Sequence, residues 1–531
     1  MPFGDVHTPS LALSLLQAEL AQASVPSRVI YLNLDFAERI GLERYDRYAT
    51  DLSGAYLGER IFADCLFPRP EREAERYVEE VLIPLERFSL EDLAGFERDL
   101  AAAGPFLEER LRSRDWGRYR AIGFTTTFQQ NTASLAFARL LKHAHPGTAI
   151  LFGGANCEGT MGAQLLKSFP WIDFVCTGEG DDVVPSLALE LAGRRPPGPI
   201  PGILRRPAGS EVPLLTHPPM VRDLDHLPFP EISDYFERVR ESPLGATMRC
   251  HITLETSRGC WWGEKHHCTF CGLNGLTMRY RSKSPWRAQR EIIDLVSRYK
   301  SMLDPDRGIS FADNILDMTY FRSLLPALRE AGLGTTLFYE TKANLTRDQV
   351  RLLAESGIRE IQSGIESLHT DLLKLMSKGC TQLQNIQLLK WCRGFGITPY
   401  WNLLFGFPGE DPCWFDEQAR IIPRLSHLKA PSMLCAVRLD RFSPYFCEAE
   451  AHGITNVRPA RALCYVYPLP EAELHGLAYH FDFDFADGRD PARYMGPLLE
   501  AARRWRRIED EAFLYALPWN DGLLLWDERE P

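Results

Sequence analysis

Residues 260–271 read Cys-Trp-Trp-Gly-Glu-Lys-His-His-Cys-Thr-Phe-Cys, which places the thiols of Cys260, Cys268 and Cys271 on one short stretch. The apolar run 251–256 just before it is typical of a buried strand. Three thiolates on one loop can hold three irons of a cubane [4Fe–4S] cluster. The fourth iron then has no protein ligand, and this open position is what a substrate-binding cluster needs.

Two other interpretations of the three thiols stay open at this point. They could bind a structural zinc ion with His266 or His267 as the fourth ligand, or they could be unrelated. The position of the stretch favours the cluster, because it directly follows a predicted strand and Arg258-Gly259 supplies the turn. No second cluster is expected, because no pair at metal-ligand spacing occurs among Cys380, Cys392, Cys413, Cys435 and Cys464.

Apolar runs and helical patterns alternate on both sides of this stretch, from residue 250 to 446. Helical spacing covers 284–300, 318–331 and 346–356, among others. Six βα units predict a partial TIM-type (β/α)6 barrel, in which the active site collects at the carboxyl ends of the strands. The six predicted strands are 251–256, 308–312, 335–340, 360–365, 398–405 and 433–439.

The N-terminal region, 1–205, has the same alternation and predicts an α/β domain with a parallel sheet covered on both faces. Between the first two strands lies a long insertion, 37–107, that is mostly helical. Glycines follow the later strands, where an open α/β sheet binds ligands. The predicted strands are 29–34, 120–125, 149–154 and 174–178, with a helix over 133–143.

Two further regions complete the predicted domain order. Residues 206–249 are predicted to be a linker, because Pro and Gly are frequent between 194 and 230. Residues 447–531 are predicted to be a smaller, mainly helical C-terminal domain that caps the substrate site, with a helix near 491–507 and an aromatic-rich end.

Composition narrows the functional classes. The 531 residues include 60 Lys plus Arg and 71 Asp plus Glu, a formal net charge of −11, which argues against a general nucleic-acid binder. No apolar run approaches the roughly 20 residues that a membrane span needs, so no membrane association is expected. Residues 1–27 lack a signal-peptide pattern and the 13 cysteines form no disulfide framework, so we expect a cytoplasmic protein with reduced thiols.

The cysteine stretch resembles that of radical S-adenosylmethionine (SAM) enzymes. Phe270, just before the last cysteine, matches the family's adenine-contacting position, although seven residues rather than the usual three separate Cys260 from Cys268. The wider spacing resembles the cobalamin-dependent (class B) branch that contains C-methyltransferases of ribosomally made peptides. The resemblance covers most of the chain and also includes Met1-Pro-Phe, Gly178-Glu-Gly and Arg441-Phe-Ser-Pro-Tyr445.

This resemblance implies that the N-terminal domain is a Rossmann-like cobalamin-binding domain. The Asp-x-His-x-x-Gly motif that supplies a cobalt ligand is absent, so the lower cobalt face is expected to lack that His. The alternative is a sheet whose glycines only make tight turns. The residues implied as cobalamin contacts are Thr126, Phe128, Gln129, Gln130, Gly153, Gly154, Asn156, Gly178, Glu179 and Gly180.

The resemblance also implies that S-adenosylmethionine binds at the strand ends of the barrel. Asp313 and Asn314 stand where the family contacts the methionine amino group, although the usual Gly-Gly-Glu is missing. Lys342 could pair with the methionine carboxylate as a point charge. For each charged residue, an ion pair at the barrel rim is the alternative role. The remaining implied contacts are Ser363 and Glu366, the latter toward the ribose, together with Asn402 and Arg438.

The implied function is cobalamin-dependent radical chemistry on an unactivated carbon of a ribosomally made peptide precursor, by C-methylation or by closing a ring such as a cyclopropane. The expected partners are the precursor peptide and an external electron donor such as flavodoxin or ferredoxin. One alternative is an enzyme acting on a lipid, an antibiotic or a tetrapyrrole. Another is a cobalamin or iron–sulfur redox sensor without catalysis, although no DNA-binding or kinase pattern provides an output module.

Overall fold

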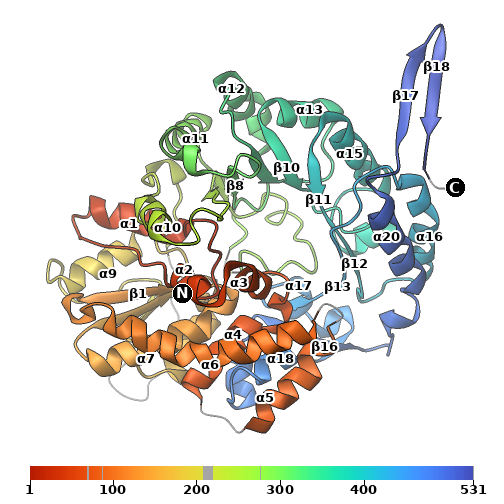
Figure 1. Ribbon diagram of the computed structural model, residues 1–531. Helices are drawn as coiled ribbons and strands as arrows, with labels where there is room; N and C mark the ends of the chain where they lie inside the picture. The colour runs from red at the N-terminus through yellow and green to blue at the C-terminus, as the bar shows by residue number, and fades with distance from the viewer. Residues whose placement is uncertain (68–70, 86–87, 207–218, 276, 530–531) are drawn as a thin grey trace. The chain divides into compact units, whose positions relative to one another are not determined.

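The computed structural model describes residues 1–67, 71–85, 88–206, 219–275 and 277–529. The chain forms two compact units (Figure 1). Unit 1 comprises residues 1–249 and 458–482, and unit 2 comprises residues 250–457 and 483–531. The domain boundaries predicted from the sequence stay predictions.

Unit 1 contains a four-stranded sheet in the order β1-β2-β3-β4. The first three strands are parallel and β4 is antiparallel to β3. This arrangement agrees with the predicted α/β fold, because helices α7, α8 and α9 follow the three parallel strands in turn. The elements are β1 (Ala121–Thr125), α7 (Asn131–Ala144), β2 (Ala149–Gly153), α8 (Thr160–Ser168), β3 (Phe174–Cys176), α9 (Val183–Leu191) and β4 (Ile203–Arg205).

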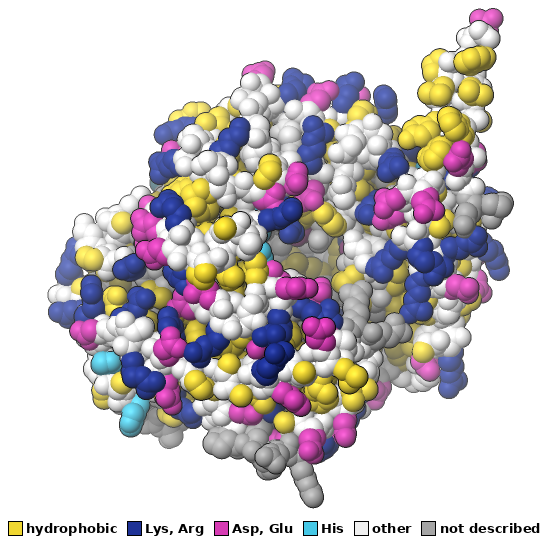
Figure 2. Space-filling view, viewed as in Figure 1, with side chains coloured by type: hydrophobic (Ala, Val, Ile, Leu, Met, Phe, Trp, Pro, Cys, Tyr) yellow, Lys and Arg dark blue, Asp and Glu magenta, His cyan; other side chains and the backbone are white. Residues whose placement is uncertain are grey.

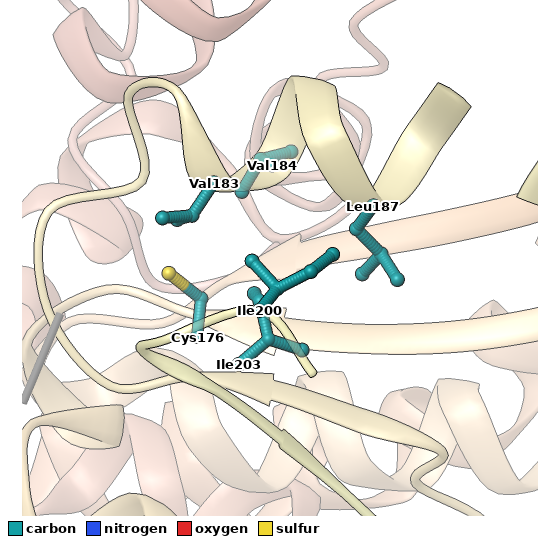
Figure 3. Packing of buried hydrophobic residues seen from close by; sticks show 6 residues of the cluster. All are labelled: Cys176, Val183, Val184, Leu187, Ile200 and Ile203. Atoms are coloured by element: carbon teal, nitrogen blue, oxygen red, sulfur yellow. The ribbon is translucent and has the colours of Figure 1, made fainter. Parts of the chain in front are cut away.

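Apolar side chains from β3, α9 and β4 meet in a small buried core (Figure 3). Val183, Val184 and Leu187 project from the first two turns of α9, and Leu187 follows Val184 by three residues and Val183 by four, the spacings that put side chains on one helix face. Cys176 and Ile203 meet them from the sheet. The core fixes the carboxyl end of β3, which leads into Gly178-Glu-Gly180.

The predicted strand 29–34 is wrong, because helix α2 (Leu32–Ile40) begins inside it. Leu32, Phe36 and Ile40 recur at helical spacing and are buried. A short apolar run cannot by itself distinguish a buried strand from the start of a helix. The insertion is helical as predicted, and its helices are α2, α3 (Leu42–Ala49), α4 (Leu57–Leu66), α5 (Glu71–Tyr77) and α6 (Leu90–Arg112).

The predicted linker 206–249 also contains ordered structure. Residues 207–218 lie outside the described part of the chain, but α10 (Ser233–Glu241) follows and buries Tyr235 and Phe236. The remaining helices of unit 1 are α1 (Leu11–Gln22), α18 (Arg461–Cys464) and α19 (Glu471–Leu477).

Unit 2 is built on a five-stranded parallel sheet in the order β11-β10-β9-β8-β5, beside a parallel pair, β12 and β13. Trp401 alone separates β11 from β12, so the predicted fifth strand passes from one sheet to the other. All six predicted barrel strands are present, which confirms the partial (β/α) barrel. They are β5 (Ile252–Leu254), β8 (Ile309–Phe311), β9 (Leu337–Glu340), β10 (Ile358–Gln362), β11 (Thr398–Tyr400) with β12 (Asn402–Phe405), and β13 (Met433–Ala436).

Helices cover the outside of this sheet (Figure 1). Within the described ranges no ladder joins β13 to β5, so the strands do not close into a hydrogen-bonded ring. The covering helices are α11 (Pro285–Tyr299), α12 (Leu324–Ala331), α13 (Arg347–Glu355), α14 (Thr370–Leu375), α15 (Gln382–Phe395) and α16 (Cys413–Ile421).

The C-terminal region differs from the mainly helical prediction, because it also contains strands. Residues 447–531 contain α20 (Gly496–Ile508) and the strands β15 (Ile454–Pro459), β16 (His480–Phe485), β17 (Leu514–Trp519) and β18 (Gly522–Asp527). The short elements β14 (Leu439–Asp440) and α17 (Pro444–Cys447) precede them. The aromatic-rich end forms the antiparallel hairpin β17–β18, because Asn520 and Asp521 make a two-residue turn. Its apolar side chains are exposed, as Figure 2 shows. None of the described helices has the length and apolar character needed to cross a bilayer.

Candidate active site

The cysteine stretch forms a loop at the carboxyl end of β5. Strands β6 (Ser257–Arg258) and β7 (Arg281–Ser282) pair on either side of it and close its base. Gly259 adopts φ +80°, and a side chain there would place its Cβ only 2.2 Å from the Arg279 carbonyl oxygen. Because only glycine fits this close approach, the Arg258-Gly259 turn sets the direction in which Cys260 leaves the strand.

The three thiols are half-buried and have few internal partners. The Gly263 N–H donates to Cys260 Sγ at 3.3 Å, and the Cys268 thiol faces the Ser377 carbonyl oxygen at 3.9 Å. Burial raises the pKa of Cys260 and raises that of Cys271 to about 12. The Cys260 and Cys271 thiols are therefore protonated on their own, and a bound iron would displace those protons.

A second loop, residues 376–380 between α14 and α15, packs against the cysteine loop. The Thr269 N–H donates to the Met376 carbonyl at 3.2 Å, and Trp262 Nε1 donates to the Ser377 carbonyl at 3.0 Å. Gly379 leaves room for the Trp262 ring, since a Cβ there would lie 2.0 Å from it. None of the site residues predicted from the sequence lies in this loop, although Ser-Lys-Gly at a helix end is a recognisable turn signal.

Two ammonium groups stand beside the thiols. Lys378 Nζ lies 3.5 Å from Glu366 Oε1, and Lys342 Nζ lies 3.5 Å from the centre of the Trp262 ring and donates to the Gly379 carbonyl. Burial opposes the charge of Lys378, but Glu366 and the nearby thiols outweigh it and raise its pKa. Burial lowers the pKa of Lys342. Positive charge here would offset the negative charge of three thiolates.

The donor set fits a cluster better than a single zinc ion. Zinc needs four donors within about 2.0–2.3 Å of one point, and no group of three or more His, Cys, Asp or Glu side chains in the described part of the chain converges in this way. A cubane instead distributes the thiolates over separate irons. His266 stacks on Trp262, and His267 Nε2 donates to the Cys271 carbonyl at 2.9 Å, so both candidate zinc ligands are already engaged.

Asp313 lies at the carboxyl end of β8 but does not face a free space. Its fully buried carboxylate accepts hydrogen bonds from the Thr256 N–H at 2.6 Å, the Thr256 hydroxyl at 2.5 Å and the Ser257 hydroxyl at 2.7 Å. Burial raises its pKa to about 6 despite these donors. The carboxylate therefore anchors the strand end that leads to Cys260, which argues against the predicted contact with the methionine amino group.

The other predicted S-adenosylmethionine contacts differ in availability. Asn314 donates to Asn274 Oδ1 at 2.9 Å and so ties the end of β8 to the cysteine loop. The Ser363 hydroxyl is buried and has no hydrogen-bond partner among the described residues, and Asn402 is half-buried on β12. Arg438 is mostly exposed and donates to Asp440 at 2.8 Å, as expected of the rim ion pair considered as its alternative.

Glu340, at the end of β9, has a carboxylate that is available to a ligand, unlike that of Asp313. No hydrogen bond involves its carboxylate within the described residues. Burial, followed by the charges of Asp313 and Glu366, raises its pKa to about 7. An acceptor without a partner at a strand end is available to a ligand in a way that a saturated carboxylate is not.

Two aromatic residues named in the sequence analysis lie in or beside the cysteine loop: Phe270 within it and Tyr445 next to it. The Phe270 ring lies 5.8 Å from that of Phe407, and Lys378 Nζ lies 5.8 Å from the Phe270 centroid. The Tyr445 N–H donates to the Thr269 carbonyl at 3.0 Å, so the segment Arg441–Tyr445 contacts the loop as well.

In unit 1, the predicted cobalamin contacts lie at the carboxyl ends of β1, β2 and β3. The Thr126 N–H donates to the Gly153 carbonyl at 2.8 Å. Gly154 adopts φ +97°, and a Cβ at this position would lie only 2.5 Å from the Thr126 carbonyl oxygen, so only glycine fits here. Asn156 Nδ2 donates to the Phe128 carbonyl at 3.0 Å. Phe128 is 52% exposed, and its ring stacks on His480.

Several other predicted contacts in unit 1 are used by the fold itself. Gln129 is buried and bonds the Gly58 N–H at 2.8 Å and the Tyr48 carbonyl at 3.0 Å. Gln130 donates to the Met1 carbonyl, and Glu179 accepts from the Val221 N–H at 2.8 Å. Gly178 and Gly180 begin the turn into α9, where the Val184 N–H donates to the Gly180 carbonyl.

Residues 254–421 match the family model of the radical SAM superfamily. The chain therefore contains a radical SAM domain, which binds a [4Fe–4S] cluster and S-adenosylmethionine. The matched segment includes the cysteine loop, the 376–380 loop and the barrel strands β8 to β12.

Comparison with curated proteins gives distant relatives. The chain is 25% identical over 299 residues to an uncharacterised methyltransferase of Pyrococcus horikoshii, a match spanning 54% of this chain and 61% of that protein. It is 24% identical over 449 residues to the hopanoid C-3 methylase of Methylococcus capsulatus, which spans 79% of this chain and 80% of the methylase.

Solved structures share the fold. The cobalamin-dependent S-adenosylmethionine radical enzyme OxsB, with aqua-cobalamin bound, gives a TM-score of 0.58 at 17% identity, covering 72% of this chain and 58% of OxsB. The radical methyltransferase TsrM of Kitasatospora setae, with cobalamin and a [4Fe–4S] cluster bound, gives 0.55 at 18% identity, covering 77% of this chain and 83% of TsrM. The overall architecture is thus that of a cobalamin-dependent radical SAM enzyme.

Proposed function

We propose that this protein is a cobalamin-dependent radical SAM enzyme that modifies an unactivated carbon of a ribosomally made peptide, by C-methylation or methyl-derived ring formation. The observation that carries the proposal is the position of Cys260, Cys268 and Cys271 on one loop at the carboxyl end of β5, within a matched radical SAM domain. When bound, the cluster supplies the radical cleavage of S-adenosylmethionine, and cobalamin supplies the carrier of the methyl group.

The residues around the loop would hold S-adenosylmethionine by its charges. Lys378, with Lys342 beside it, offers positive charge to the methionine carboxylate. Glu340 offers an unsatisfied acceptor to the methionine ammonium group, in place of Asp313. Glu366 remains the candidate for the ribose hydroxyls, and Phe270 and Trp262 exclude water from the same region.

Cobalamin would bind at the carboxyl edge of the unit 1 sheet. Gly153 and Gly154 give a close backbone approach there, and the exposed Phe128 ring offers an apolar face. OxsB and TsrM, which share the fold, are described with cobalamin bound, and this supports the assignment. The Asp-x-His-x-x-Gly motif is absent, so the chain would hold cobalamin without a histidine from that motif.

The substrate class has a second candidate. The relative from Methylococcus capsulatus acts on a hopanoid by its name, so a polycyclic lipid is the alternative to a peptide. Either substrate would require an external electron donor such as flavodoxin or ferredoxin, which we propose as a partner.

Anaerobic reconstitution tests the proposal. The full chain is loaded with iron, sulfide and hydroxocobalamin and given S-adenosylmethionine, a reductant and a candidate peptide. We expect 5′-deoxyadenosine and S-adenosylhomocysteine, and a peptide heavier by one methylene group, by mass spectrometry. Cys268→Ala should abolish 5′-deoxyadenosine, whereas Cys392→Ala, a buried thiol on α15, should not. One zinc ion per chain without inorganic sulfide would contradict the proposal.

A further inference from the structure

The two faces of the barrel sheet have opposite chemistry. Side chains on the helix-covered face are buried and almost all apolar: Ile252, Leu254, Ile309, Phe311, Leu337, Tyr339, Ile361, Trp401 and Leu403. Side chains on the inner face are half-buried or exposed, and most are polar: Thr253, Ser310, Glu340, Glu360, Gln362, Thr398, Tyr400 and Asn402, beside the apolar Phe338, Leu404, Met433 and Cys435. A complete TIM barrel fills its interior with packed, branched apolar side chains instead.

Four of the inner residues, Glu360, Gln362, Tyr400 and Asn402, form what we call the inner polar row. Gln362 stands level with Glu340 on one side and with Tyr400 on the other in the strand register. The Tyr400 hydroxyl donates to Glu360 Oε1 at 2.7 Å. Gln362 is exposed, and the described residues provide no hydrogen-bond partner for its amide or for that of Asn402.

We propose that the inner polar row is the substrate-recognition site and that it selects an amide-bearing chain, a peptide, over a hydrocarbon or a carboxylated ring system. The inference rests on the proposed function and deepens it by choosing between its two substrate classes. Two carboxamides, a phenol and a carboxylate together offer both donors and acceptors, and a peptide backbone presents the complementary set. The flanking Phe338 and Met433 add apolar contact for side chains.

The two other substrate classes fit this face poorly. A polycyclic hydrocarbon covering the inner face would exclude water from the two carboxamides and from Glu360 without replacing their hydrogen bonds. A tetrapyrrole would bring its own carboxylates toward Glu360, a like-charge contact. A peptide with a Lys or Arg side chain would instead gain an ion pair with Glu360.

Tyr400 stays a hydrogen-bond donor under ordinary conditions. Burial, followed by Glu360, raises its pKa to about 12. Its hydroxyl therefore holds the Glu360 carboxylate in a fixed orientation and leaves the second carboxylate oxygen for the substrate.

Affinity selection with mass spectrometry tests the inference. The cluster-loaded full chain with S-adenosylmethionine is incubated anaerobically with three probes in parallel. The probes are a random octapeptide-amide library, a saturated pentacyclic triterpene in cyclodextrin, and protoporphyrin IX. We expect retention of octapeptides enriched in Lys or Arg, with slower hydrogen exchange at residues 358–364 and 398–404. Retention should fall at least tenfold in Gln362→Leu, and Glu360→Gln should remove the preference for Lys and Arg.

Glu355→Gln is the matched control, because it makes the same chemical change on α13, on the outside of the barrel. It should retain the same octapeptides as the natural chain. Retention of the triterpene or of protoporphyrin IX in place of octapeptides would overturn the inference. So would equal octapeptide retention by the natural chain, Gln362→Leu and Glu360→Gln. Formation of 5′-deoxyadenosine, measured after a chemical reductant is added to the same samples, reports separately on the proposed radical function.

Discussion

The carboxyl edges of the two parallel sheets both collect polar side chains, but they use them differently. In unit 1, Gln129, Gln130 and Glu179 are consumed by hydrogen bonds to backbone groups of the same unit. In unit 2, Glu340 and Gln362 have no such partners within the described residues. A polar residue at a strand end is therefore weak evidence for a ligand until its internal hydrogen bonds have been counted.

Removing a cluster thiol should give the largest effect and should leave the other sheet untouched. We expect Cys260→Ala to lower 5′-deoxyadenosine formation by at least about a hundredfold, because even outer-shell changes at metal sites cost about 10–100-fold. Bound iron and sulfide should fall in parallel. Cobalamin binding by unit 1, measured by its visible absorbance after gel filtration, should be unchanged. If Cys260→Ala also lost cobalamin, the cluster site of unit 2 and the proposed cobalamin site of unit 1 would not be independent.

Glu340 should make the affinity for S-adenosylmethionine depend on pH. Its pKa is raised to about 7, mainly by burial, so the carboxyl is largely neutral at pH 6 and an anion at pH 8. The anion accepts hydrogen bonds from the methionine amino group better than the neutral carboxyl does, so affinity should rise between pH 6 and 8, by about fivefold if the anion contributes about 1.4 kcal/mol more than the neutral form. Isothermal titration should show a flat profile for Glu340→Gln. The same pH dependence of affinity in the natural chain and in Glu340→Gln would mean that another group binds the methionine amino group.

Substitutions of the adjacent residues Phe128 and Gln129 should affect different properties, cobalamin binding for Phe128 and the free energy of unfolding for Gln129. Phe128→Ala should weaken cobalamin binding about tenfold with little change in Tm, because a large exposed aromatic face is lost without disturbing the core. Gln129→Ala should lower the free energy of unfolding by about 1–3 kcal/mol, because it leaves the Gly58 N–H and the Tyr48 carbonyl unpaired. Thermal melts and cobalamin titration of both variants give the comparison. The reverse pattern would mean that Gln129 is the contact.

Arg438→Ala should give the smallest effect. Its side chain is 57% exposed and paired with Asp440, and exposed pairs contribute about 0–1 kcal/mol. Stability should change by no more than this, and the affinity for S-adenosylmethionine should stay within about twofold. A tenfold loss of affinity would restore the contact predicted from the sequence.

The barrel could be predicted from the sequence because its strands are short apolar runs separated by helical periods. The same rule failed at residues 29–34, where Leu32, Phe36 and Ile40 belong to a helix that starts inside an apolar run. It also missed the C-terminal hairpin, whose strands are apolar on both faces and so lack the period-two alternation of a half-buried strand.

The site could be predicted only in part, for a different reason. The spacing of the cysteines predicts the cluster site. Lys378 lies more than a hundred residues further along the chain, and only the fold of the 376–380 loop brings it close to them. Asp313 and Glu340 both end barrel strands, and nothing in their local sequence shows that Thr256 and Ser257 occupy one and leave the other free.

The missing ladder between β5 and β13 within the described ranges would affect how a long substrate enters. A closed ring of strands would accept a polymer only by threading it end first, so the reacting residue would have to lie near a terminus. Strands that do not close into a ring would instead let the middle of an extended chain lie against the inner face, with both ends outside. For the proposed peptide substrate, the position of the modified residue would then be set by local side chains and not by its distance from either end.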